Sequence, residues 1–134
     1  MALQFSTTVR NGMLDAIETG AGVSAILKIR TGAQPANCAA ADTGTVLATI
    51  NLASDWAAVA SGGTKAFSSL PVTDASADGT GTAAHFRLYA TDGTTCHSQG
   101  SAGTSGTDII LDSASFTVGQ TFNVTAWTWA APGA

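Results

Sequence analysis

The sequence contains few charged residues. Lysine, arginine, aspartate and glutamate make up only 10% of the chain, whereas about a quarter is usual for a soluble domain. Five residues are basic, and only Lys28 and Arg30 lie close together. Binding to nucleic acid requires a stripe of basic side chains that displaces counterions from phosphate, and binding to anionic lipid requires a similar cluster. The composition therefore argues against a nucleic-acid partner and against a membrane partner.

Long hydrophobic runs are also missing. No stretch approaches the roughly 18 apolar residues of a membrane-spanning helix. The first residues, MALQFS, lack the basic start and the apolar run of a secretory signal. We therefore expect a protein that is made in the cytoplasm and used without Sec export.

Cysteine is rare, with Cys38 and Cys96 as the only two. Without export, reduced thiols are the default expectation, because the cytosol keeps cysteines reduced. A Cys38–Cys96 disulfide is the alternative, since a particle released from a cell can oxidise later. A zinc site needs about four ligands at close spacing, and the two cysteines with two histidines are too scattered to provide them.

Residues that could catalyse a reaction are scarce. Glu18 is the only glutamate, and several aspartates occupy turn positions, where the carboxylate bonds its own backbone: Asp74, Asp78, Asp92 and Asp112. We interpret His85 and His97 as a solvated pair on neighbouring strands. A nucleophile–base pair of Cys96 and His97 fails, because adjacent residues of a strand point to opposite faces. No nucleophile elbow, phosphate loop or zinc-helix motif occurs. The sequence therefore predicts a non-enzymatic protein without a metal or cofactor.

The first 22 residues predict a helix preceded by a short arm. Apolar side chains recur every four residues, at Phe5, Val9, Met13 and Ile17. Ser6 or Thr7 can cap the start, and Gly20 and Gly22 suit the end. The charged residues Arg10, Asp15 and Glu18 lie off this apolar stripe. We expect the stripe to dock on the domain's own sheet, and an arm that reaches a neighbouring subunit is the alternative.

From residue 24 onward the apolar period changes to two, which is typical of strands. Eight or nine short strands with turn signals between them predict an all-β fold, an antiparallel β-sandwich with a jelly roll as the favoured topology. The expected strands are 24–30, 45–52, 56–60, 65–70, 83–91, 95–99, 108–111, 115–118 and 121–129, with a small-residue loop at 100–106. The 134 residues form one domain, with the helix and arm in 1–22 and the sandwich in 23–134.

Three tryptophans are the most prominent candidates for binding. Trp127 and Trp129 fall on one face of the last expected strand, opposite Phe122, Val124 and Ala126. Together with Trp56 they could pack in the core, form a subunit interface, where tryptophan is enriched, or make a platform that stacks on carbohydrate. All three interpretations stay open at this point. The N-terminal residues Leu3 and Phe5 are further candidates for a subunit interface.

The order of several segments resembles small structural proteins of tailed bacteriophages. The segments are MALQFSTTVRNGMLDAIETGAG, AILKIRTGAQPAN, LATINLA, DASADGTGTAAHFRLYATDGT and SFTVGQTFNVTAW, which together span nearly the whole chain. The resemblance implies a virion component, most simply a capsid decoration (cement) protein on the outer capsid surface. Its partner would be the major capsid protein, and the chain would form a homo-oligomer, a dimer or a trimer.

The chain departs from these relatives at Cys38, at Cys96 and in the Gly100–Gly106 loop, which leaves a shared oligomeric arrangement open. Two other functions fit the sequence. One is a structural protein of the tail or of the head–tail connector. The other is a carbohydrate-binding module for host attachment, which would use the tryptophans.

Overall fold

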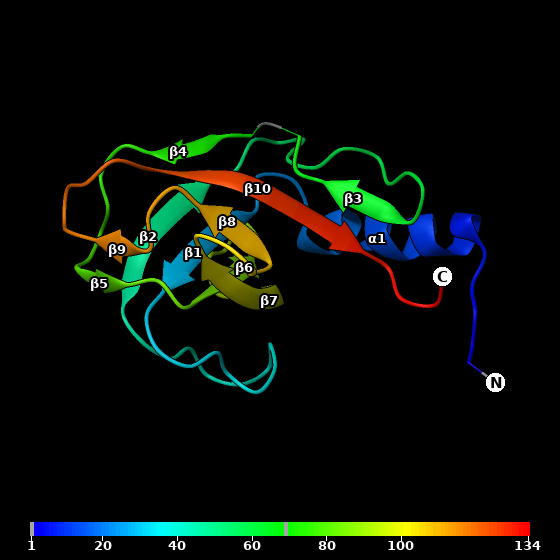
Figure 1. Cartoon of the computed structure of the whole chain (residues 1–134), viewed down its shortest axis with the longest axis horizontal. Coiled ribbons are helices and arrows are strands. Elements are labelled where there is room, and N and C mark those ends of the chain that lie inside the picture. Colours follow the sequence, from blue (N-terminus) through cyan, green and yellow to red (C-terminus); the bar gives the residue numbers. More distant parts are fainter. Residues whose placement is uncertain (1, 69) are drawn as a thin grey trace.

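The computed structural model describes residues 2–68 and 70–134 (Figure 1). It confirms the expected fold class, a mainly β protein with one short helix near the N-terminus. The elements are α1 (Thr7–Ala21), β1 (Ile26–Arg30), β2 (Val46–Asn51), β3 (Thr64–Ala66), β4 (Val72–Asp74), β5 (Gly81–Thr82), β6 (His85–Tyr89), β7 (Cys96–Gly103), β8 (Ile109–Leu111), β9 (Ser115–Phe116) and β10 (Phe122–Ala130). Met1 of the predicted arm and Ser69 of the predicted strand 65–70 lie outside the described residues.

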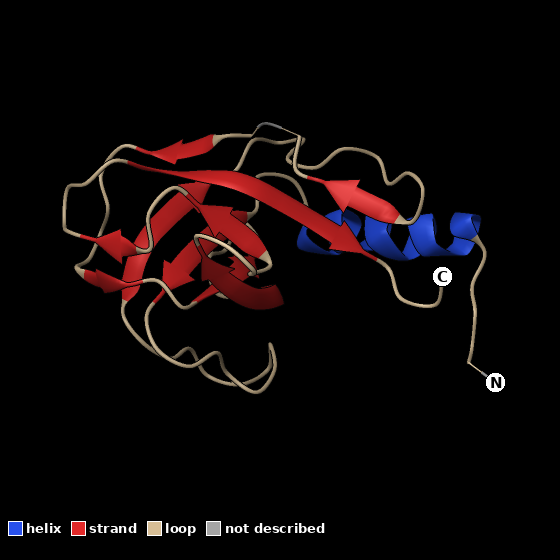
Figure 2. Cartoon of the chain, viewed as in Figure 1, coloured by secondary structure: helices blue, strands red, loops and turns tan. Residues whose placement is uncertain are grey.

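One curled sheet contains most of the strands. Its order is β2-β1-β6-β7-β8-β10-β3, and β4 also pairs with β10. The pairs are antiparallel except for β7 and β8, which run in parallel over two residue pairs. Strands β5 and β9 form a separate two-stranded sheet, at the opposite end of the molecule from α1 (Figure 2). The curled sheet is compatible with the sandwich or jelly roll that the strand spacing suggested.

An aromatic cluster fills the core between β6, β10 and the segment before β3. Trp127 is 2% exposed, and its ring centroid lies 5.1 Å from that of Phe67 and 5.2 Å from that of Phe86. Trp56 is fully buried and stacks against Trp127 at 6.2 Å. Such offset and edge-on contacts contribute energy beyond the burial of area alone. Of the three interpretations left open, packing in the core therefore holds for Trp56 and Trp127, and Trp127 is corrected as a candidate for a subunit interface.

A bulge in β10 explains why the predicted faces of this strand were wrong. The pairing with β8 shifts between Val124 and Ala126, so one extra residue interrupts the alternation. As a result Trp127 lies on the buried side with Phe122 and Val124, whereas Ala126 is exposed. A strict period of two places Trp127 on the opposite face.

Strand β6 is buried on both faces. All five residues from His85 to Tyr89 are buried, although the alternating pattern predicts one polar, solvated face. Phe86 and Leu88 belong to the hydrophobic core. The opposite side is covered by residues 31–45, which we call the strap, and in Figure 1 the strap hangs as a long loop below the sheet.

Two other predictions also needed correction. Strand β7 continues to Gly103, through most of the predicted loop 100–106. Gly100 allows this, since a Cβ atom there would lie 2.7 Å from Cε1 of Phe86. The predicted strand 56–60 is reduced to a single bridge between Ala57 and Phe67.

Removal of the Trp127 side chain tests this description of the core. We expect Trp127→Ala to lower the free energy of unfolding by roughly 3–5 kcal/mol, because a large buried side chain leaves a cavity. The control is Val59→Ala at a side chain that is 83% exposed, where the change should stay within about 0.5 kcal/mol. Urea unfolding followed by circular dichroism measures both, and similar values for the two variants would contradict a buried Trp127.

Candidate functional site

Helix α1 begins and ends as its sequence predicts. The Ser6 hydroxyl accepts a hydrogen bond from the N–H of Val9 at 3.3 Å, and Gly22 ends the helix with a φ of 82°. Its N–H donates to the carbonyl of Glu18 at 2.8 Å. These contacts satisfy backbone groups that a helix end leaves open.

The face that α1 turns toward the domain combines apolar and polar side chains, so the predicted apolar docking stripe is right only in part: Ile17 packs against the core, whereas Val9 and Met13 do not. Leu14 and Ala21 are its buried residues, and polar side chains complete the contact. Arg10 donates through Nε and an Nη to the carbonyl of Ala131 at 3.3 and 3.1 Å. Asn11 Oδ1 accepts from the N–H of Gly63 at 2.9 Å. The β3 end of the sheet presents backbone groups that polar side chains of the helix satisfy.

Lys65 of β3 is the centre of this polar contact. The residue is 2% exposed, and its Nζ lies 2.9 Å from Asp15 Oδ1 and 3.0 Å from Glu18 Oε2. Burial alone would lower the pKa of Lys65, but its hydrogen bonds to the two carboxylates outweigh burial and raise that pKa. The bond from Lys65 lowers the pKa of Asp15, and the N–H of Ala60 adds to this effect. Lys65 and Asp15 are therefore charged at neutral pH, and Lys65 pairs with both carboxylates within the fold.

The opposite side of α1 is exposed and carries no charged side chain. We define the outer helix face as Val9, Gly12, Met13, Ala16 and Gly20, all of which are exposed. Val9 is 48% exposed and Met13 is 41% exposed. These two residues belong to the predicted stripe, but they point to solvent. An uncharged apolar helix face that is exposed is typical of a contact with another macromolecule.

The N-terminal arm lies beside this end of the molecule. Leu3 is 74% exposed, so it is accessible to a partner as the sequence suggested. Phe5 is half-buried, and its N–H donates to the carbonyl of Gly133 at 2.7 Å. A Cβ atom at Gly133 would lie 2.6 Å from the Phe5 ring, so a glycine is needed there. In Figure 1 the C-terminal end lies beside the start of α1, and the N-terminal arm leads into the helix on the same side of the molecule.

The two remaining interface candidates lie in different positions. Trp127 is buried and cannot contact a second subunit, which corrects the prediction. Trp129 is partly buried and packs edge-on against Trp127 at 4.8 Å and against Trp56 at 5.9 Å. The indole N–H of Trp56 donates to the carbonyl of Gly22 at 2.9 Å. With two of the three rings buried, the tryptophans do not form an open platform for a sugar.

A second cluster lies beneath the strap, where sequence reasoning identified no site. Asp42 on the strap accepts hydrogen bonds from Arg87 and from the Tyr89 hydroxyl on β6. Its other oxygen lies 2.8 Å from an Nη of Arg30 on β1. Arg87 is 1% exposed, and its other Nη donates to the carbonyls of two strap residues, Asn37 and Ala40. A buried guanidinium requires such partners.

The titratable groups of this cluster have shifted pKa values. Burial alone would raise the pKa of Asp42, but the bonds from Tyr89 and Arg87, together with the charge of Arg30, lower it. Burial raises the pKa of Tyr89, and its bond to Asp42 adds to this effect. Burial lowers the pKa of His85, and its Nδ1 lies 2.9 Å from the carbonyl of Gly32. His85 therefore stays neutral near pH 7.

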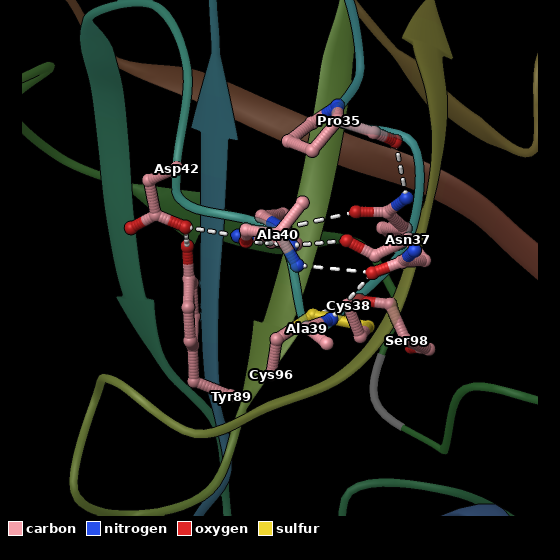
Figure 3. Close-up of a disulfide and its surroundings, with 11 residues drawn as sticks. Pro35, Asn37, Cys38, Ala39, Ala40, Asp42, Tyr89, Cys96 and Ser98 are labelled. Atoms are coloured by element: carbon pink, nitrogen blue, oxygen red, sulfur yellow. Dashed lines mark hydrogen bonds and ion pairs between the residues drawn. A yellow bond between two sulfur atoms is a disulfide. The ribbon is translucent and has the colours of Figure 1, made fainter.

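The strap is also joined covalently to β7. Cys38 and Cys96 form a disulfide with a Cα–Cα distance of 5.2 Å, whereas the sequence favoured reduced thiols. Figure 3 shows this bond close to Asn37 and Ser98, with Asp42 of the strap above Tyr89 of β6. Nearby, Gln99 donates from Nε2 to the carbonyl of Pro35 at 2.7 Å. The strap is thus attached to the sheet through ion pairs, hydrogen bonds and one covalent bond.

Neither cluster has the arrangement of a reaction centre. Asp42, Asp15 and Glu18 are paired with cations, and His85 is buried while His97 is exposed. The two histidines thus do not form the solvated pair that the sequence suggested. Within residues 2–68 and 70–134, no group of three or more histidine, cysteine, aspartate and glutamate side chains could hold a metal ion. None of the described helices is long and apolar enough to cross a membrane. The outer helix face with Leu3 is therefore the candidate functional site.

Known proteins offer no guide to its role. Comparisons of the chain with protein families, with curated proteins and with solved structures found no match.

Replacement of Asp42 tests the cluster beneath the strap. We expect Asp42→Asn to lower the free energy of unfolding at pH 7 by on the order of 2 kcal/mol, because two buried guanidiniums lose a charged partner. The pKa of Asp42 is lowered in the fold, so its stabilising effect is present above the unfolded pKa of about 3.9 and is lost as the pH falls through the folded value.

The difference between the two proteins should therefore shrink as the pH is lowered from 7 toward 3. Denaturant unfolding at several pH values measures this difference. Asp15 is present in both proteins, so its own titration largely cancels. A difference that stays constant over this range would contradict the role of an ionised Asp42.

Proposed function

We propose that this chain is a structural protein of a tailed-phage virion, a capsid decoration (cement) protein that binds the shell of the major capsid protein. The observation that carries the proposal is the outer helix face, which is apolar, uncharged and exposed. The part of the proposal that concerns a phage virion rests on the resemblance of the sequence segments to phage structural proteins. Virion localisation on the outer capsid surface follows from this function.

The arrangement of charges around α1 favours binding through this face. Arg10, Asp15 and Glu18 already bond groups of the same chain, so a partner on the outer helix face does not remove them from water. Removing unpaired charges from water would cost several kcal/mol for each ion. The contact therefore gains about 25 cal/mol for each Å² of apolar surface that it buries, without that penalty.

A cement function needs no chemistry at the contact. Many copies that each bridge neighbouring subunits of the shell would oppose the outward pressure of packaged DNA. Closed dimers or trimers of the chain would match the two-fold or three-fold sites of the shell.

A tail or head–tail connector protein is the second candidate, because a helix face of this kind suits any assembly of subunits. The two functions differ in copy number. A connector is present in about six or twelve copies, as ring symmetry requires, whereas a cement protein approaches the number of major capsid subunits. The buried positions of Trp56 and Trp127 count against a carbohydrate-binding module built on the tryptophans.

Quantitative mass spectrometry of purified heads tests the proposal. We expect the chain in heads of the encoding phage, at a copy number comparable with that of the major capsid protein. Cryo-electron microscopy of the same heads should place α1 against the shell. Absence of the chain from heads would overturn the proposal, and a copy number of about six or twelve would support the connector function instead.

A charge on the outer helix face tests the surface itself. We expect the double variant Val9→Glu, Met13→Glu to lose co-sedimentation with heads that lack the chain, because two carboxylates would be desolvated at the contact. The matched control is Val118→Glu, a side chain that is 63% exposed beside the β9 end of the molecule. This control should bind as the wild type does, and equal binding by the double variant would show that another surface makes the contact.

A further inference from the structure

We propose that the Cys38–Cys96 disulfide is a redox lock on the strap. While the bond is intact, the strap stays closed over β6. When the bond is reduced, the strap opens and closes locally while the sheet stays folded. This inference goes beyond the proposed function and does not depend on it, since it concerns the face of the sheet at β1, β6 and β7.

The strap is held at its two ends and at its middle. At the ends, the N–H of Thr31 donates to the carbonyl of Thr45 at 3.0 Å, and the N–H of Thr45 donates to Thr31 Oγ1 at 2.8 Å. Cys38 lies midway between these two residues in the sequence. The disulfide therefore joins the middle of the strap to β7. This is the point of the strap that is farthest along the chain from β1 and β2, the two strands that the strap connects.

The other contacts of the strap are polar. Pro35 is its only residue that is buried, and the rest of 31–45 is exposed or half-buried. A segment with few buried apolar contacts opens at low free energy, and water replaces the hydrogen bonds that it loses. The strap therefore lacks the apolar anchoring that would keep it closed at all times without the covalent bond.

Some polar atoms under the closed strap are not satisfied. Among the described residues, Arg30 Nε and His85 Nε2 are buried without a hydrogen-bond partner. The two residues pair across β1 and β6, so both atoms belong to the floor that the strap covers. An unpaired buried polar atom is unfavourable, and opening of the strap gives both atoms access to water. This effect lowers the cost of opening further.

The floor remains in place when the strap opens. Strand β6 is paired on both sides, with β1 and with β7, and its other face packs in the core. Opening separates Asp42 from Arg30 and Arg87, so two guanidiniums become accessible on an otherwise acidic chain. The reduced protein would thus present a basic surface that the oxidised protein hides.

The redox step is ordinary thiol–disulfide exchange with a dithiol as the reductant. One thiolate of the dithiol attacks a sulfur of the Cys38–Cys96 bond, that bond breaks, and the released cysteine thiolate takes up a proton. The second thiolate of the dithiol then displaces the other cysteine. Two electrons pass from the dithiol to the protein, which ends with two thiols while the dithiol becomes a cyclic disulfide. Both cysteines are partly exposed, so a small reductant can reach them.

Limited proteolysis with elastase tests the lock, because the strap contains several alanines after which elastase cuts: Ala33, Ala36, Ala39, Ala40 and Ala41. The oxidised chain is compared with the same chain reduced by dithiothreitol, and mass spectrometry maps the cuts. We expect cleavage in 31–45 to be at least about tenfold faster after reduction, because local opening exposes the backbone. Near-ultraviolet circular dichroism of the buried tryptophans should stay unchanged.

Two variants complete the experiment. The double variant Cys38→Ser, Cys96→Ser should be cut as fast as the reduced wild type without any reductant. Asp42→Asn should stay resistant while oxidised, because the disulfide then holds the strap without the ion pairs, and it should be cut faster than the reduced wild type once it is reduced. Equal cleavage of the oxidised and reduced wild type would overturn the proposal. Loss of the tryptophan signal on reduction would also overturn it, since the whole fold rather than the strap would then depend on the bond.

Discussion

The ion pair between Arg87 and Asp42 is the interaction on which the burial of the outer side of β6 depends. A guanidinium that is 1% exposed in a central strand must have partners, and the strap supplies a carboxylate and two carbonyls. With this cover in place, β6 can be buried on both faces and occupy the middle of the sheet between β1 and β7. The same strap brings Cys38 to Cys96, so the polar contact and the covalent bond belong to one local structure.

The sequence predicts those parts of the fold that depend on neighbouring residues. The apolar period of two from residue 24 onward identifies β1 within the expected strand 24–30. The caps of α1 lie where Ser6 and Gly22 predict, and the turn at Asp92 forms with the expected side-chain bonds. The failures involve distant partners. No local pattern reveals that residues 31–45 cover β6, or that a bulge moves Trp127 into the core.

Helix α1 shows how an amphipathic pattern can hold for only part of a helix, since Leu14 and Ile17 pack inward but the other apolar residues of the pattern do not. A four-residue apolar repeat normally marks the docked side, since apolar burial is the largest favourable term in folding. Here Lys65 and the backbone N–H of Gly63, next to β3, bond to carboxylate and amide side chains of the helix instead. The charged side chains face inward, and Val9 and Met13 stay outside. This arrangement gives the molecule a neutral helix surface, and that surface is the basis of the proposed contact with other subunits.

The strand order also has a consequence for how the chain folds. Strand β1 pairs with β2 and with β6, and in the latter pair Arg30 lies opposite His85, fifty-five residues later. Strand β10 pairs with β3 and β4, which precede it by a similar separation. Because the paired residues are far apart in the sequence, the relative contact order is high. The chain loses conformational entropy when these long loops close, before the contacts between the strands stabilise the fold. A domain of this kind folds in roughly milliseconds to seconds, and its unpaired strand edges stay open to other chains during that time.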